Sequence, residues 1–161
     1  MSMFRLGAVL ATPLWLCAVV MPATARADTD ACKLLTPSQV GAAVAVAVSD
    51  GKHVAPTFMK TCTWTASGDS DVKTVTLYLQ TAAAYDGGKQ MAGQMVATSK
   101  VGAMKPASVG DDSYYFATGD QVGLLVKKGA NSFKVTVYAT LPVDRKEAME
   151  LTLAKEVLAK L

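Results

Sequence analysis

The sequence contains few of the residues and motifs that indicate a particular chemistry. It has three cysteines and one histidine in 161 residues. Only two of the cysteines lie outside an N-terminal leader, and two cysteines with one histidine cannot complete a four-ligand zinc site without carboxylates. No complete metal-binding or phosphate-binding motif is found. These absences disfavour an enzyme and predict no catalytic residue, no cofactor and no metal.

The chain also lacks a strong charge of either sign. It carries 16 basic and 13 acidic residues, a formal net charge of +3. Two of the basic residues, Arg5 and Arg26, lie in the leader, which contains no acid. The remainder therefore has a net charge of about +1, which argues against electrostatic capture of nucleic acid or of an anionic membrane.

Residues 1–27 have the pattern of a secretory signal peptide. Arg5 supplies a positive n-region, residues 6–20 are apolar apart from one threonine, and Ala25-Arg26-Ala27 forms an A-x-A cleavage site. We therefore expect the leader to be removed and residues 28–161 to form one exported domain, periplasmic or secreted.

A permanent membrane anchor is the alternative to cleavage. The apolar run is shorter than the roughly 20 residues that a spanning helix needs, and Pro13 interrupts it. Cys17 could carry a lipid, but the bulky Trp15 and Leu16 stand where a lipobox has small residues. No stable membrane insertion and no lipoprotein anchoring through Cys17 are expected.

Cys32 and Cys62 are the two cysteines of the exported part, and an oxidising compartment favours a disulfide between them. Closing a loop of about 31 residues stabilises the fold by roughly 3.7 kcal/mol in the chain-entropy model. A metal pair or a reactive thiol is the competing interpretation. The structural disulfide is the prediction.

Three helices are predicted from caps and apolar spacing. Thr36-Pro37-Ser38-Gln39 is a capping box with proline at the first helical position, and Ser49-Asp50-Gly51 ends this helix. A second helix is predicted between Asp86 and Ser99. Asp144 and Glu147 predict an N-cap pair for a third helix that runs to the C-terminus.

Five strands are predicted, separated by turn sequences: 58–65, 72–80, 113–118, 121–127 and 132–140. On the first of them Cys62 and Trp64 are two residues apart, so both should face the core. The order α-β-β-α-β-β-β-α predicts an α+β domain with a five-stranded, mainly antiparallel sheet and its helices packed on one face.

Three segments together carry a resemblance to a known group. They are Asp30-Ala31-Cys32-Lys33-Leu34-Leu35-Thr36-Pro37, Cys62-Thr63-Trp64 and Val109-Gly110-Asp111-Asp112-Ser113-Tyr114-Tyr115. Their order is similar to that in small exported bacterial proteins, often actinobacterial lipoproteins, of a domain-of-unknown-function family. The resemblance implies an envelope-associated, non-catalytic fold and no substrate. The missing lipobox departs from the lipoprotein members.

Several short motifs resemble functional sites but are incomplete. His53 and Gly68-Asp69-Ser70 suggest an esterase, yet no histidine follows Ser70. Asp69-Ser70-Asp71 has only the first two ligands of a calcium loop, and Gly88-Lys89 lacks the other residues of a phosphate loop. Asp111 and Asp112 should point to opposite faces of a strand. Turns and solvated loops explain these residues better.

Met91, Met95, Met104 and Met149 are four methionines that could bind copper in an exported protein, but their spacing favours core packing.

Tyr114 and Tyr115 are the candidate interaction residues, because alternation sends one of them to each face of the strand. Either one ring faces solvent as a contact or both faces are covered, and the sequence leaves both possibilities open. The favoured function is a non-enzymatic binding or interaction module for an unknown protein or small ligand of the envelope. The alternatives are a small carboxylate-dependent hydrolase and an inhibitor of a secreted enzyme, which would present a rigid loop such as residues 66–71.

Overall fold

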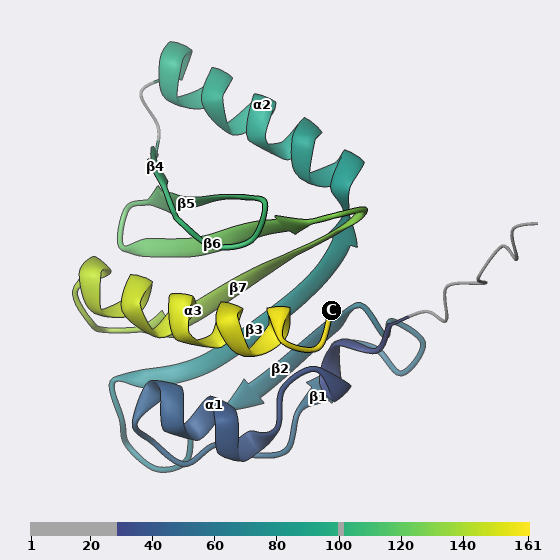
Figure 1. Ribbon diagram of the computed structural model, residues 1–161. Coiled ribbons are helices and arrows are strands. Elements are labelled where there is room, and N and C mark those ends of the chain that lie inside the picture. The colour runs from purple at the N-terminus through teal and green to yellow at the C-terminus, as the bar shows by residue number, and fades with distance from the viewer. Residues whose placement is uncertain (1–28, 100–101) are drawn as a thin grey trace, which may run out of the picture.

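The computed structural model describes residues 29–99 and 102–161, which form an α+β domain (Figure 1). The predicted signal peptide and Cys17 lie outside the described residues. The described chain contains a short 3-10 helix, three α-helices and seven strands. In chain order these are η1 (Ala31–Lys33), α1 (Pro37–Val44), β1 (Lys52–His53), β2 (Thr61–Thr65), β3 (Val72–Thr81), α2 (Ala82–Ser99), β4 (Ala103–Pro106), β5 (Asp112–Thr118), β6 (Gln121–Lys128), β7 (Asn131–Ala139) and α3 (Val143–Leu158).

All seven strands form one antiparallel sheet in the order β1-β2-β3-β7-β6-β5-β4. The β2–β3 hairpin and the β5–β6–β7 meander are those that the sequence predicts. The prediction of five strands is wrong, because β1 and β4 add one short strand at each edge. Two and four residues are too few to show alternation, so these strands have no local signal.

The first helix begins where the sequence places it. The Thr36 hydroxyl accepts from the Gln39 N–H at 3.2 Å, and the Gln39 side chain accepts from the Thr36 N–H at 3.0 Å. The helix ends earlier than predicted. Ala45 adopts a left-handed conformation with φ 56°, so the chain leaves the helix there and not at Ser49. Val48 then makes an isolated bridge to Ala66 beside the sheet.

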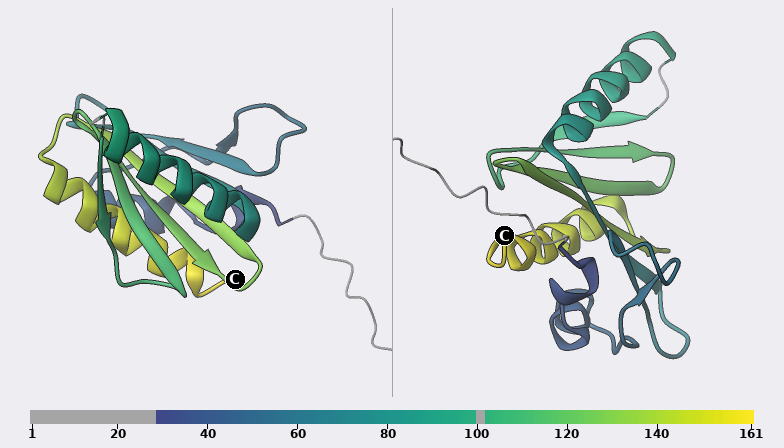
Figure 2. Two further views of the ribbon diagram at one scale, coloured as in Figure 1. Left: turned by 90° about the horizontal axis from the view of Figure 1, so that it is seen from above. Right: turned by 90° about the vertical axis from the view of Figure 1, so that its right-hand side faces the viewer.

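The helices cover both faces of the sheet, which corrects the prediction of one covered face. Figure 1 shows α1 and α3 on one side of the strands and α2 on the other, and the right view of Figure 2 shows the same separation. The main core lies between the sheet and α1 and α3. A smaller cluster, built on Tyr85, Ala92 and Tyr114, lies between the sheet and α2.

The disulfide and Trp64 belong to the main core, as predicted. Cys32 and Cys62 are bonded, with their Cα atoms 5.0 Å apart, so η1 is tied to β2. Trp64 is fully buried two residues further along β2. Gly51 passes so close that a β-carbon on it would stand 2.6 Å from Cys62 Sγ and 2.7 Å from Trp64 Nε1. Only glycine leaves room for this contact.

The third helix starts without the predicted cap. Its N-cap is Pro142, which makes no side-chain hydrogen bond, and Glu147 instead pairs with Lys105 of β4 at 2.5 Å. The Glu147 carboxylate is therefore engaged in a tertiary ion pair and not in a local N-cap interaction with the start of α3. The Lys105 ammonium has a raised pKa because the Glu147 carboxylate bonds it.

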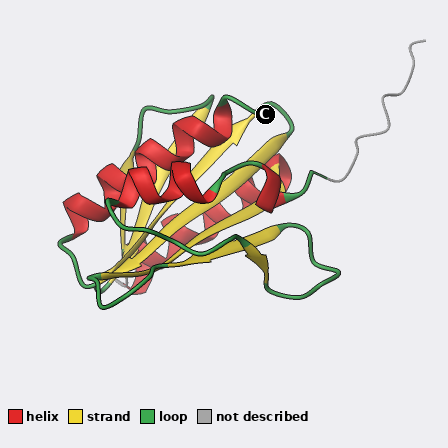
Figure 3. Ribbon diagram, turned by 90° about the horizontal axis from the view of Figure 1, so that it is seen from below, coloured by secondary structure: helices red, strands yellow, loops and turns green. Residues whose placement is uncertain are grey.

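α3 also closes a gap in the sheet. The pairing of β6 with β7 ends at Leu124 and Val135, and beyond this point the two strands diverge (Figure 1). Figure 3 shows from below how the strands of the sheet fan out from one end. The buried Glu150 accepts a hydrogen bond from the Val137 N–H at 3.0 Å, and the buried Lys146 ammonium donates to carbonyls of Asp120 and Ala139. Two polar side chains of α3 therefore satisfy backbone groups that the ladder leaves unpaired.

Candidate functional site

The two predicted interaction tyrosines are both buried, so both faces of their strand are covered and neither ring faces solvent. Tyr115 lies in the main core with an exposed fraction of 6%, and its hydroxyl donates to the Glu147 carbonyl at 3.1 Å. Tyr114 lies under α2 with 3% exposed, its ring 5.5 Å from that of Tyr85. Burial raises the pKa of all three tyrosines, that of Tyr115 to about 12. Neither predicted ring is available as a surface contact.

Two ion pairs hold the first half of α2 against the sheet. Lys89 bonds Asp112 of β5 at 2.6 Å, and Lys127 of β6 bonds Asp86 at 2.7 Å. The Lys89 ammonium is the main cause of the lowered pKa of Asp112. Lys89 therefore anchors α2 to β5.

Further along α2 a groove opens between the helix and the sheet, and we call it the methionine groove. Its volume is about 190 Å³, and its lining is almost entirely apolar: Gly88, Met91, Ala92, Met95, Tyr114, Phe116, Leu125 and Lys134. Met91 is 63% exposed at its rim. Helix packing does not bury this side chain, contrary to the core packing expected for it.

Beyond the groove the same side of the sheet has no helix over β2, β3 and the end of β7 that carries Tyr138, and we call this region the open face (Figure 2). Side chains alternate between the two sides of a strand, so paired residues on neighbouring strands form rows across this face. Thr63 pairs with Thr76 and Thr76 with the buried Thr136, while Thr74 pairs with Thr65 and Tyr138. The Thr63 and Thr76 hydroxyls are hydrogen-bonded at 3.3 Å.

Two tyrosines on the open face are exposed. Tyr78 is 38% exposed and stacks on Phe58, with ring centroids 6.4 Å apart, and Tyr138 is 42% exposed. Tyr78 and Tyr138 lie in different rows. Tyr78 pairs with Thr61 at the open end of the β2–β3 hairpin, and Tyr138 pairs with Thr74 near the turn. The open face is thus a hydroxyl-rich strip with an aromatic side chain at each end.

The remaining predicted acids take part in turns and ion pairs. Asp111 accepts from the Gly129 N–H and from Lys128, and these contacts lower its pKa. It does not converge with Asp112, which faces α2. Asp69 pairs with Lys73 at 3.6 Å, and the Asp71 carboxylate accepts from the Thr140 hydroxyl at 3.2 Å.

A larger pocket of about 620 Å³ adjoins the Asp69–Asp71 turn. It mixes apolar side chains with acids and bases, including Lys73, Arg145 and Met149. Both of its aspartates contact neighbouring side chains, Asp69 that of Lys73 and Asp71 that of Thr140.

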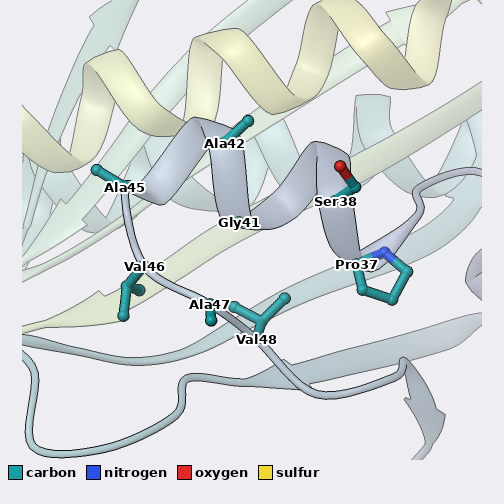
Figure 4. A pocket seen from close by; sticks show the side chains of 8 residues that line it. All are labelled: Pro37, Ser38, Gly41, Ala42, Ala45, Val46, Ala47 and Val48. Atoms are coloured by element: carbon teal, nitrogen blue, oxygen red, sulfur yellow. The ribbon is translucent and has the colours of Figure 1, made fainter.

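Figure 4 shows a second hollow, between α1 and the segment that follows it. Its volume is about 450 Å³ and its lining is made of small side chains: Pro37, Ser38, Gly41, Ala42, Ala45, Val46, Ala47 and Val48. Ser38 is the single polar side chain among them. This hollow offers little for specific recognition, because pockets select ligands through several placed polar groups.

His53 lies apart from all these features, beside the disulfide. Its Nε2 is 3.2 Å from Asp30 Oδ1, and its Nδ1 is 3.0 Å from the Thr61 carbonyl and 3.7 Å from Cys32 Sγ. The nearest carboxylate is thus that of Asp30, and Ser70 is not its partner. The interpretation of His53 as a surface-loop residue is wrong, because the side chain is only 20% exposed.

Comparison with known proteins gives no further constraint. No protein-family model matches the chain, and neither the curated proteins nor the solved structures give a significant match. Within residues 29–99 and 102–161, no helix has the length and hydropathy to cross a bilayer. A disulfide is typical of chains that fold in an oxidising, exported environment.

Sequence reasoning missed three of the residues that stand out in the structure. Tyr78 and Tyr138 alternate with buried strand residues, so their outward direction was readable, but not which sheet face a helix would leave open. No local pattern marks Asp30, because its contact with His53 joins two segments that are far apart in the chain.

Proposed function

We propose that this protein is an exported, non-enzymatic binding module of the bacterial envelope that uses the open face to hold a protein or small ligand. The observation that carries the proposal is the open face over β2, β3 and the end of β7, with Tyr78 and Tyr138 exposed on it. Tyrosine is enriched at binding interfaces because a large, stiff ring contributes contact area at little entropic cost.

The adjoining methionine groove extends this surface. Methionine side chains are flexible and polarisable, so they fit apolar ligands of varied shape. Lys134 lines the groove and neighbours Tyr78 in the register of β3 with β7, and so connects the groove to the open face. The proposed binding surface is therefore continuous, from a hydroxyl-rich strip to an apolar slot.

A carboxylate-dependent hydrolase is the less supported alternative. It needs two acids that converge on one bond, each free to exchange a proton. Asp111 and Asp112 bond different lysines, and Asp69 and Asp71 each have a partner. These pairings favour a binding role over hydrolysis.

The binding role is tested by exchanging Tyr78 and Tyr138 together for serine. The immobilised wild-type and variant proteins are incubated with a detergent extract of the envelope of the source bacterium, and retained molecules are compared by mass spectrometry. We expect the variant to lose the specifically retained species with a melting temperature within about 2 °C of wild type, because exposed side chains contribute little to folding.

Leu161→Ser is the matched control, since Leu161 is as exposed as Tyr78 but lies at the end of the chain. It should retain the same species as wild type. An identical retained set for wild type and the double variant would contradict the proposal.

Export is tested separately by N-terminal sequencing of the protein recovered from the envelope. We expect a first residue of Asp28. A chain that keeps residues 1–27, or that begins at a lipid-modified Cys17, would contradict the proposed localisation.

A further inference from the structure

A half-buried cluster beside the main core brings together side chains of three separate segments. Asp30 lies before η1, His53 ends β1, and Cys32 is joined to Cys62 of β2. Three potential ligand atoms, a carboxylate oxygen of Asp30, Sγ of Cys32 and a ring nitrogen of His53, lie within 4.8 Å of one another. Carboxylate, thiolate and imidazole are the ligand types that zinc takes in proteins.

The contacts of His53 leave one ring nitrogen facing a carboxylate. Nδ1 lies 3.0 Å from the Thr61 carbonyl, to which an Nδ1–H would donate. Nε2 lies 3.2 Å from the Asp30 carboxylate. With Nδ1 turned to the carbonyl, Nε2 is the nitrogen that can bind a metal ion beside Asp30.

The geometry suits a metal ion. Ligands bound at about 2.0–2.1 Å and at the tetrahedral angle are separated by about 3.3 Å, close to the distance between Nε2 and Oδ1. Zinc-binding histidines commonly donate their other N–H to a carbonyl or carboxylate, which fixes the tautomer and the ring orientation. The bond from Nδ1 to the Thr61 carbonyl is of this kind.

The two sulfurs would complete the set once the disulfide is reduced. Cys32 Sγ is 3.7 Å from His53 Nδ1, the nitrogen that faces the Thr61 carbonyl, and the Cα atoms of the two cysteines are 5.0 Å apart. Rotation of the freed Cys32 side chain toward Nε2 would let both thiolates reach one ion. Trp64 Nε1 is buried and has no hydrogen-bond partner among the described residues. Trp64 Nε1 and Cys62 Sγ both lie close to Gly51, so this nitrogen is near a sulfur that reduction would free.

We propose that the reduced chain binds one Zn²⁺ through Cys32, Cys62, His53 and Asp30, and that disulfide formation releases the ion. A dithiol reductant transfers two hydrogen atoms to the disulfide and itself becomes a disulfide. Zinc then binds the two sulfurs as thiolates, and their two protons go to solvent. Oxidation by a disulfide reverses both steps. The proposal does not depend on the binding role of the open face.

The test titrates purified protein with ZnCl₂ in parallel, oxidised and after reduction with a phosphine that does not bind zinc. We expect one zinc per reduced chain and an affinity at least about a hundredfold higher than for the oxidised chain, which offers only Asp30 and His53. Cobalt in place of zinc should give thiolate-to-metal charge-transfer absorption and tetrahedral ligand-field bands in the reduced protein only.

Variants separate a folded site from chelation by an unfolded chain. His53→Gln and Asp30→Asn each remove one ligand and should lower the zinc affinity of the reduced protein at least about tenfold. Asp50→Asn is the matched control, because Asp50 is exposed and lies outside the cluster. It should bind zinc as wild type does. The near-ultraviolet circular dichroism of Trp64 reports folding in each sample, and a reduced chain that refolds only when zinc is added also supports the site.

Three results would overturn the proposal. One is a reduced protein that binds no stoichiometric zinc, or that stays unfolded in its presence. Another is equal affinity in the wild type, His53→Gln and Asp30→Asn, which would mean that the thiols alone chelate the ion. The third is equal binding by the oxidised and reduced proteins.

Discussion

Replacing Glu150 with glutamine should make the protein more stable above neutral pH and flatten its dependence on pH. Glu150 is fully buried on α3. One carboxyl oxygen accepts from the Val137 N–H at 3.0 Å, while the other has no partner among the described residues. Burial raises the pKa of Glu150 to about 8 from 4.5, against the opposing effect of the Val137 bond.

The direction follows from proton binding. Between pH 4.5 and about 8 the native state holds a proton on Glu150 that the unfolded chain has lost. The free energy of unfolding therefore falls as pH rises through this range, and this contribution becomes constant above pH 8. At about 1.4 kcal/mol for each pH unit, the total cost of the buried carboxylate is of the order of 5 kcal/mol. This is a large share of the roughly 5–15 kcal/mol that stabilises a typical domain.

Glutamine removes the titration but keeps the size of the side chain and a carbonyl oxygen for the Val137 N–H. Urea denaturation of both proteins at one-unit steps from pH 5 to pH 9 measures the difference. We expect the free energy of unfolding of the variant to exceed that of wild type by a margin that grows to several kcal/mol as the pH rises from 5 to 8. Glu156→Gln, the same substitution at a partly exposed site on α3, is the control and should give no such gain. Parallel curves for wild type and Glu150→Gln would refute the reasoning.

Three further predictions concern the core around the disulfide. Trp64→Ala should lower the free energy of unfolding by about 3–5 kcal/mol, measured by urea denaturation, because it empties a fully buried site; a loss below 1 kcal/mol would contradict this packing. Gly51→Ala should lower the melting temperature, because its β-carbon would stand 2.6 Å from Cys62 Sγ, whereas Gly87→Ala on the exposed side of α2 should not. Mass spectrometry of non-reduced peptides should find Cys32 linked to Cys62, and two free thiols in protein taken from the envelope would contradict the bond.

The sequence determined the features that depend on neighbouring residues. The capping box at Thr36 needs contacts over three positions only, and it starts α1 where predicted. Alternation along a strand placed Cys62 and Trp64 together in the core and sent Tyr114 and Tyr115 to opposite faces. The disulfide was readable because only one pairing exists between two cysteines.

Tertiary structure decided everything that depends on which surfaces meet. The ion pairs of Lys89 and Lys127 place α2 on the second face, which buries Tyr114 and leaves Tyr78 exposed. The edge strands β1 and β4 form because longer neighbours offer them hydrogen-bond partners. Glu150 is buried because β6 and β7 diverge and leave the Val137 N–H unpaired. Asp30 meets His53 only after the chain closes a long loop, and no interaction between near neighbours carries that information.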